Sequence, residues 1–494
     1  MNTETIIFTG VAIYLVAMLG IGVYASRRVG SADNFIVAGR RMPIWICSAT
    51  IVATWFGGGT MMGASGAAYE GGLLGVIADP FGGALGLFLV GFFFVRIFRR
   101  LRLLTFVDFF QNRYGKTAAT IAAIGSISSN IGWTGALLVA FGFVFESLTG
   151  VPLEIGIMGG AVVVFIYTVA GGMWAVALTD FVQMVVIAVG LILLLVVVLI
   201  DVGGWGNIAP HLPEDTFRMV PLEHTAAIWT DYVRAWLIFG LADVSAQTLM
   251  QRAFSAKNEQ VAQNSFYIAS FSYLSFGMIP VTLGIIASVT MPGLVDPETV
   301  VPEMAIAHLH PVFIAVFVGA LLAAIMSSAD SALLAAASVL STNILPLFKS
   351  NASDRLRLVS TRVAIPVFGV IAVYIALEVQ VVYDLILDAN SVILVSVTIP
   401  FIVGVWWQRA NRTGALASMA MGFITWLVTI VTAPELAGDL LGLMAGLVTM
   451  LLVTPLTQKF DPPMPLLNGD GEEVAFKDRL GTLPLFRRAN LESE

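Results

Sequence analysis

The sequence predicts an all-α polytopic membrane protein with thirteen transmembrane helices. Of its 494 residues, 58% are hydrophobic and only 12% are charged, and the mean hydropathy is +0.90. A soluble globular domain carries about a quarter charged residues, so this composition excludes that class. The apolar residues form successive segments long enough to cross a bilayer, and basic residues gather in the connections expected on the cytoplasmic side.

Composition also limits the chemistry of the protein. The single cysteine, Cys47, excludes an intrachain disulfide, and the chain has only four histidines to add to it as ligands of a structural zinc ion. The sequence contains no P-loop, no dinucleotide-binding glycine motif and no Ser/His/Asp arrangement typical of a hydrolase. We therefore expect a protein that is not an enzyme and has neither an organic cofactor nor a nucleic-acid partner.

Six apolar segments form the first half of the expected topology. They lie at residues 5–26, 43–69, 72–98, 117–147, 152–170 and 179–199. The first has no basic residue before it and Arg27 and Arg28 after it, which is the reverse of a cleaved signal peptide and predicts an external N-terminus. Segment three ends in arginines and leads into LLTFVDFFQNRYGK, which predicts an amphipathic helix at the cytoplasmic surface. A Gly-Gly turn separates segments five and six, and Asp180 follows it.

Seven further segments complete the topology. They lie at residues 226–254, 261–291, 318–345, 360–379, 382–406, 413–433 and 437–457. Residues 1–457 thus form one transmembrane domain, and the polar tail 458–494 is expected to be cytoplasmic and poorly ordered. Only Arg218 and Arg234 fall off the cytoplasmic side in this arrangement, as the positive-inside rule requires. Arg218 belongs to an outer loop, whereas Arg234 lies within a span.

Segment two contains a predicted break. Its ATWFGGGTMMGASG stretch includes Gly57–Gly59, and each glycine costs about 1 kcal/mol relative to alanine in a helix. Unwound backbone at membrane depth is tolerated where it lines a cavity, and its carbonyls can hold a cation. The alternative is a close packing face formed by Gly59 and Gly63. Trp55 lies beside the break, in the middle of the span rather than at the interface.

Segment nine carries polar side chains at mid-membrane. On a helix, Ala324, Ser327, Ser328 and Ser331 share one face and Asp330 lies at its edge. A carboxylate at this depth is costly and usually marks an ion or proton site. Hydroxyl and carbonyl oxygens suit a small hard cation such as sodium. The alternative, serines that only allow helices to pack closely, does not explain the acid.

Three stretches of the chain resemble a known family. YTVAGGMWAVALTDFVQ, MQRAFSAKN and AAIMSSADSALLAAASVLSTNI are similar to the sodium:solute symporter family, and the similarity extends from ATWFGGG to about residue 430. Within it, ATWFGGG, DFFQNRYGK and NASDRLRLVSTRVAIPVFG most resemble the high-affinity choline transporter branch. The resemblance implies a LeuT-like five-plus-five inverted repeat at about 43–201 and 226–406, with one extra helix before it and two after. Broken segments two and seven would cross at the midplane.

The resemblance also implies sodium ligands. The main site falls on the backbone carbonyls of Ala53, Phe56 and Ala324 and on the hydroxyls of Ser327 and Ser328. A second cation site in some relatives falls here on Asp180, Ser327, Asp330 and Ser331. Whether that second site holds sodium or a proton stays open.

The candidates for substrate binding are Trp55, Gly58, Trp133, Arg234, Asp243 and Gln247. The two tryptophans match positions that cage a quaternary ammonium in the choline branch by cation–π contact, although both could simply pack in helix seams. Arg234 departs from that branch, which carries an acid at about this position. A buried guanidinium opposes a bare cation and favours a carboxylate. Asp243 could neutralise it instead. A betaine-like or amino-acid zwitterion satisfies the rings and Arg234 together.

The expected function is sodium-coupled import of a small organic solute by alternating access in the cytoplasmic membrane. The partners are the solute, sodium and the lipid bilayer, and the oligomeric state is open. One alternative is a proton-coupled transporter of the same fold with Asp330 as the carrier. Another is a membrane sensor that binds the ligand without transporting it.

Overall fold

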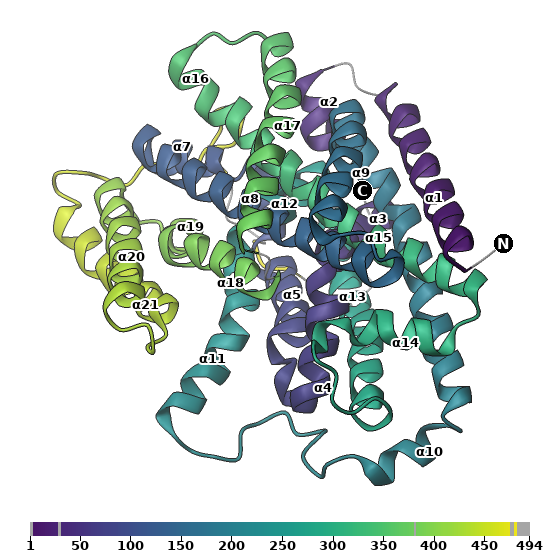
Figure 1. The fold of residues 1–494 in the computed structure, drawn as a ribbon. Helices are drawn as coiled ribbons and strands as arrows, with labels where there is room; N and C mark the ends of the chain where they lie inside the picture. Colours follow the sequence, from purple (N-terminus) through teal and green to yellow (C-terminus); the bar gives the residue numbers. More distant parts are fainter. Residues whose placement is uncertain (1–2, 28–30, 380–381, 475–478, 482–494) are drawn as a thin grey trace, which may run out of the picture.

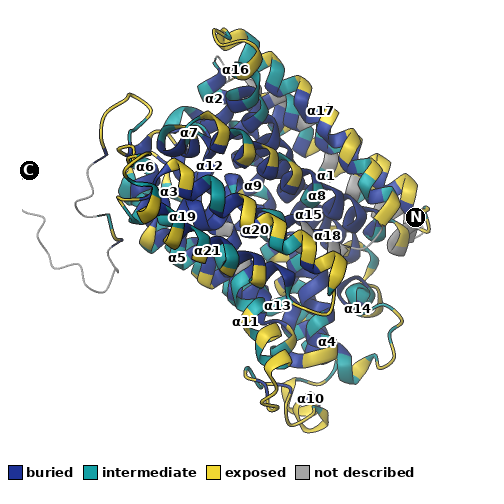
Figure 2. Ribbon diagram, turned by 90° about the vertical axis from the view of Figure 1, so that its left-hand side faces the viewer, coloured by how far each residue is buried: buried dark blue, intermediate teal, exposed yellow. Residues whose placement is uncertain are grey.

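The computed structural model describes residues 3–27, 31–379, 382–474 and 479–481. Within them the chain is helical, and no strand is found beyond two isolated β-bridges. Long helices lie side by side around a buried centre, and α20 (Arg412–Thr432) and α21 (Gly438–Thr457) contact each other at one edge (Figure 1). Buried residues concentrate between the helices, and exposed ones lie on the outer helix faces and loops (Figure 2).

The first half of the chain ends with α9. Its elements are α1 (Thr3–Ser26), α2 (Ala32–Val37), η1 (Ala38–Arg40), α3 (Ile44–Trp55), η2 (Gly59–Gly63), α4 (Ala64–Gly75), η3 (Ile77–Gly82), α5 (Gly83–Phe93), α6 (Val95–Leu101), α7 (Val107–Tyr114), α8 (Lys116–Thr149) and α9 (Leu153–Asp201).

The second half begins in the loop after α9. Its elements are α10 (Trp205–Ile208), η4 (Ala209–His211), α11 (Ala226–Leu241), η5 (Ala242–Ser245), α12 (Gln247–Ser255), α13 (Glu259–Thr290), η6 (Pro297–Thr299), α14 (Val300–His308), α15 (Pro311–Val339), η7 (Leu340–Ile344), α16 (Leu345–Phe348), α17 (Asp354–Val379), α18 (Val382–Ile393), η8 (Leu394–Thr398) and α19 (Ile399–Trp406), followed by α20 and α21.

Eight helices in the described residues are long and apolar enough to cross a membrane, and ten if each of two bent pairs counts as one span. Two further apolar helices, Ala12–Gly22 and Leu153–Ile166, are shorter. Each expected segment coincides with a helix or with consecutive helices, so the all-helical membrane architecture is confirmed. The number thirteen itself stays a prediction.

The predicted break in segment two is confirmed. Helix α3 ends at Trp55 and the chain resumes helical structure at Gly59, with a bend of 61° between the two parts. Phe56, at the start of the break, has φ −76° and ψ 71°, which turns its carbonyl away from the helix axis. Segment seven is broken as well, because Ala246 is extended (φ −73°, ψ 123°) between η5 and α12.

The Gly-Gly turn between segments five and six appears as a kink inside α9. Gly172 has φ 53° and ψ −146°, a conformation that L-residues rarely adopt. A Cβ atom there would lie 2.5 Å from the carbonyl oxygen of Phe35. The close approach of α2 and the backbone conformation therefore both require glycine at this position.

Helix α15 is the most buried of the long described helices, as the polar residues near its middle require. The window of its span Pro311–Phe348 is 83% buried, against 28% for α21. Every residue from Val318 to Val339 is buried, and α15 packs against α1, α3, α8 and α9. Segment nine thus starts earlier than expected, at Pro311, and its polar residues face protein rather than lipid.

The described part of the C-terminal tail, expected to be poorly ordered, contacts α5 and the end of α6, whereas residues 475–478 and 482–494 of the tail lie outside the described residues. The Gly469 amide donates to the Leu101 carbonyl at 2.7 Å, and Arg102 pairs with Asp470 at 2.9 Å. The Gly481 amide donates to the Phe92 carbonyl at 2.6 Å. Two apolar side chains of the tail, Leu466 and Val474, are also buried in the core.

Candidate functional site

Two serines of α15 meet the last turn of α3 beside its break. The Ser327 hydroxyl donates to the Ala53 carbonyl at 2.8 Å and to the Ala324 carbonyl at 3.0 Å. The Ser328 hydroxyl is 3.4 Å and 3.2 Å from the same two oxygens. All four residues are buried. The structure therefore brings four of the five predicted sodium ligands together as a cluster of uncharged oxygens, and Phe56 begins the break next to them.

The glycines of the break allow this close approach. A Cβ atom at Gly57 would lie 2.7 Å from the Ser328 hydroxyl and 3.3 Å from a methyl group of Leu137. A Cβ atom at Gly58 would lie 2.8 Å from Ala140 on α8. Gly57 thus faces the serines, whereas Gly58, a candidate substrate contact, packs against α8 and does not line the neighbouring cavity.

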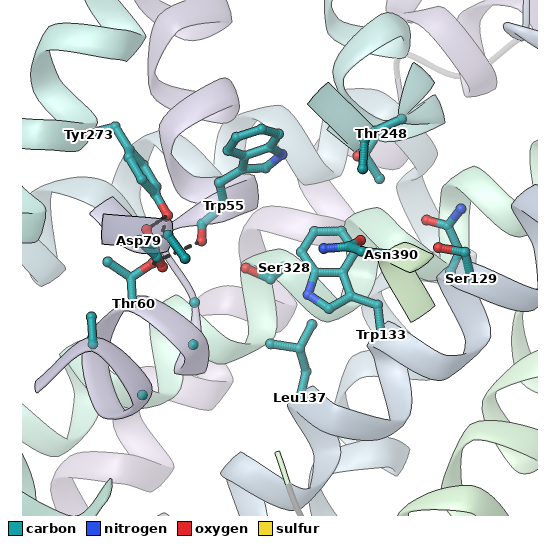
Figure 3. A pocket seen from close by; sticks show the side chains of 18 of the residues that line it. Trp55, Thr60, Asp79, Ser129, Trp133, Leu137, Thr248, Tyr273, Ser328 and Asn390 are labelled. Atoms are coloured by element: carbon teal, nitrogen blue, oxygen red, sulfur yellow. Dashed lines mark hydrogen bonds between the residues drawn. The ribbon is translucent and has the colours of Figure 1, made fainter. Parts of the chain in front are cut away.

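A cavity adjoins the two serines. Its walls come from the two helix breaks, from α8, α13 and α18, and from Ser328 itself (Figure 3). Three predicted substrate residues, Trp55, Trp133 and Gln247, line it. The remaining lining residues are Gly57, Gly59, Thr60, Gly63, Ala64, Ala67, Gly75, Ala78, Asp79, Ser129, Asn130, Leu137, Ala242, Ala246, Thr248, Tyr273, Asn390 and Ile393.

An acid that the sequence reasoning missed, Asp79, lies in this wall. Its Oδ1 accepts a hydrogen bond from the Tyr273 hydroxyl at 2.6 Å, and its Oδ2 accepts one from the Thr60 hydroxyl at 2.7 Å. The two hydroxyls are themselves 2.7 Å apart. The signal was available, because an aspartate inside apolar segment three meets the same criterion that singled out Asp330.

Gln247 lines the cavity and carries an amide donor that is unpaired among the described residues. Its side chain is fully buried and its Oε1 accepts the Phe106 amide at 2.8 Å. Its Nε2 has no hydrogen-bond partner in the described part of the structure. In Figure 3, Thr248 and Ser129 lie on the side of the cavity away from the Asp79 cluster, and Asn390 overlaps Trp133 in this view.

Arg234 lies away from the cavity. Its Nε is 2.7 Å from Oδ2 of Asp439, so the guanidinium joins α11 to α21. The Asp439 side chain is 1% exposed and that of Arg234 is 35% exposed. Arg234 is therefore neutralised by an acid of α21. The side chain of the expected partner Asp243 falls outside the described part of the structure.

The residues of the expected second cation site surround an arginine. The hydroxyl of Thr50 donates to Asp180, and Arg252 Nη2 lies 3.8 Å from Oδ2 of Asp180. The same Nη2 donates to the Ser331 hydroxyl at 2.5 Å, and that hydroxyl lies 3.1 Å from Oδ1 of Asp330. All five side chains are buried. The positive-inside rule predicts Arg252 on the cytoplasmic side, whereas its side chain is fully buried beside Asp180.

Comparisons with known proteins agree with this architecture. The model of the sodium:solute symporter family matches residues 35–422. The human high affinity choline transporter 1 is 30% identical over 86% of this chain and 76% of its own length. The osmoregulated proline transporter OpuE of Bacillus subtilis is 27% identical over 92% of this chain and 95% of its own length.

Two solved structures share the fold. An outward-open, substrate-bound Na⁺-coupled sialic acid symporter has a TM-score of 0.81 at 20% identity and covers 91% of this chain and 97% of its own. The nucleobase-cation-symport-1 family transporter MHP1 has a TM-score of 0.56 at 14% identity, with 88% and 96% covered. At these identities the likeness shows the fold alone, which is LeuT-like.

Proposed function

This chain belongs to the sodium:solute symporter family, and on that premise we propose that it imports a small organic solute with a cationic nitrogen, driven by sodium. The family and the fold make it a multi-pass membrane transporter, not an enzyme. Sodium is held by the carbonyls of Ala53, Phe56 and Ala324 and by the two hydroxyls that contact them. The solute occupies the cavity beside them.

The observation that carries the proposal is the double role of Ser328. Its hydroxyl is 3.4 Å from the Ala53 carbonyl in the ion cluster, and the same residue lines the cavity. A cation that draws these oxygens together holds α15 against the broken end of α3, and this fixes one wall of the cavity. Two ligands that stabilise the same arrangement increase each other's affinity, which is the thermodynamic basis of coupled transport.

The driving force follows from charge and concentration. One sodium ion crossing about 100 mV releases roughly 2.3 kcal/mol, and a tenfold sodium gradient adds about 1.4 kcal/mol. Together they support about 500-fold accumulation of an uncharged or zwitterionic solute per sodium ion. A cationic solute is also drawn inward by the potential itself, so it gains the electrical contribution a second time.

The walls indicate the chemical class of the solute. Trp55 and Trp133 both border the cavity and keep part of their surface accessible, so each ring can face a ligand. A cation over an indole gains about 0.5–2 kcal/mol. Both a quaternary ammonium and a zwitterion carry a cationic nitrogen that can make this contact with the two rings. Gln247 adds an amide donor for an oxygen of the solute.

The cluster around Arg252 is proposed as the second cation site. Two buried carboxylates, those of Asp180 and Asp330, belong to this cluster with one guanidinium. A monovalent cation, either sodium or a proton, adds positive charge beside them. Ser331 connects this cluster to the main site, because its hydroxyl also donates to the Ser327 carbonyl at 2.8 Å.

We also propose the orientation that the arginine distribution predicts, with the N-terminus outside and the C-terminus inside the cytoplasmic membrane. The transmembrane domain then covers residues 1–457, with inverted repeats at about 43–201 and 226–406. Arg96 and Arg100, which pair with Glu259 at 3.5 Å and 3.0 Å, belong to the cytoplasmic face.

Uptake into proteoliposomes tests the function. An inward sodium gradient should drive accumulation of a radiolabelled organic cation, and replacing external sodium by potassium should abolish it. Accumulation driven by a pH gradient in the absence of sodium would instead support the proton-coupled alternative. Binding without accumulation under either gradient would support the sensor.

A further inference from the structure

We propose that Asp79 is the counter-charge of the transported solute, and that it selects organic cations that carry no carboxylate. This inference rests on the proposed function and specifies its substrate class. It makes Asp79, held by Thr60 and Tyr273, the residue that decides between a cation and a zwitterion.

The carboxylate is held in place by neutral donors. Each oxygen of Asp79 accepts one hydroxyl, from Tyr273 at 2.6 Å and from Thr60 at 2.7 Å. Thr60 also lies 3.4 Å from the Trp55 carbonyl, which ties this group to the break of segment two. Both donors are neutral, so neither of them cancels the charge of the ionised carboxylate. Because the carboxylate is already oriented, it loses little freedom when a cation binds.

Aromatic rings complete the environment of a cation. Tyr273 meets the ring of Trp55 edge to face, with centroids 6.1 Å apart. Trp133 borders the same cavity from α8. A cationic nitrogen in this cavity therefore meets a carboxylate and indole faces together, which are the two groups that attract it most strongly.

No positive side chain compensates Asp79. Among the described residues, no Lys, Arg or His lines the cavity, and no ion pair includes Asp79. The two arginines that could have served are engaged elsewhere, Arg234 with Asp439 and Arg252 with Asp180. A solute carboxylate would enter a site whose only described charge has the same sign.

A zwitterion gains too little on the opposite side of the cavity. The polar side chains that line the cavity away from the Asp79 cluster are neutral hydroxyls and amides, such as Thr248 and Asn390. Neutral donors offset the desolvation of a hydroxyl or a carbonyl, but much less of the desolvation of a carboxylate. The geometry therefore favours a cation that ends in a hydroxyl or another neutral acceptor.

Three small ligands of nearly the same shape test this. Choline is a cation, glycine betaine adds a carboxylate, and 3,3-dimethyl-1-butanol replaces the nitrogen of choline by carbon. Affinity would be measured by thermal stabilisation of the purified protein in saturating sodium. Choline should bind at least about 10-fold more tightly than either analogue. Asp79→Asn should lower the affinity for choline by about 10-fold or more without lowering the affinity for the alcohol.

Two variants serve as controls for folding and for charge. Tyr273→Phe removes one hydrogen-bond donor to Asp79. It should lower the affinity for choline less than Asp79→Asn does, and sodium should still stabilise the protein. Arg234→Gln, outside the cavity, should leave the order of the three ligands unchanged. Equal affinity for choline and glycine betaine in the unaltered protein, unchanged choline binding in Asp79→Asn, or no stabilisation by choline would each overturn the proposal.

The same measurements separate this inference from the function on which it rests. If the unaltered protein shows neither stabilisation by sodium nor gradient-driven uptake, the proposed function is contradicted. Sodium-dependent uptake of a zwitterion or a neutral solute that Asp79→Asn does not affect would contradict only the role of Asp79.

Discussion

Replacing Ser327 by alanine tests the sodium site most directly. The hydroxyl is fully buried and donates to two carbonyls, at 2.8 Å on Ala53 and at 3.0 Å on Ala324. Its removal deletes one of the five proposed sodium ligands and leaves the Ala53 carbonyl with only the longer contact to the Ser328 hydroxyl, at 3.4 Å. Loss of one such buried polar partner costs about 1–3 kcal/mol. A value of about 2 kcal/mol corresponds to roughly 30-fold weaker sodium binding.

Thermal unfolding at fixed sodium concentration measures this loss. At a concentration 100 times the dissociation constant, sodium stabilises the unaltered protein by about 2.7 kcal/mol. With 30-fold weaker binding, the same concentration stabilises Ser327→Ala by only about 0.9 kcal/mol. The difference between sodium and potassium buffers should therefore fall to about a third.

Ser338→Ala is the matched control. Ser338 lies on the same helix, is equally buried and also donates to a backbone carbonyl one turn back, that of Leu334 at 2.6 Å. It has no contact with the broken end of α3. Both variants should lower the stability in potassium, but only Ser327→Ala should lose the response to sodium. An identical sodium response in Ser327→Ala and the unaltered protein would refute the ion site.

Three further outcomes are expected. Gly57→Ala should lower sodium affinity and uptake because its Cβ would lie 2.7 Å from the facing serine hydroxyl, whereas Gly71→Ala, with nothing within 4 Å, should leave both unchanged in the same assays. Arg234→Gln should destabilise the protein by about 1 kcal/mol in thermal unfolding, since it strands buried Asp439, and adding Asp439→Asn should restore part of the loss; strictly additive effects would contradict this pairing. Burial raises the pKa of Asp108 on the short helix α7, so the folded protein binds more protons there than the unfolded chain. Stability should fall as pH rises from the usual pKa through the raised one, and Asp108→Asn should flatten that slope in unfolding midpoints; an unchanged slope would exclude Asp108 as its source.

Local sequence determined the class of the protein and the main features of its ion site. Apolar segments of spanning length and the placement of arginines predict a membrane protein of many helices. The glycine triplet predicts the break after Trp55, because consecutive glycines weaken a helix wherever it packs. The serine face of segment nine follows from helical periodicity alone, and the structure places it against the carbonyl of Ala53.

Only the tertiary structure decided which charges meet. Arg234 pairs with Asp439, more than 200 positions later, and Arg252 of α12 meets Asp180 of α9. Asp79 enters the cavity because η3 and α13 bring it to Thr60 and Tyr273. Periodicity describes which residues share a helix face, but electrostatic pairing depends on distances between helices. Those distances are set by packing of the whole bundle, and no local pattern encodes them.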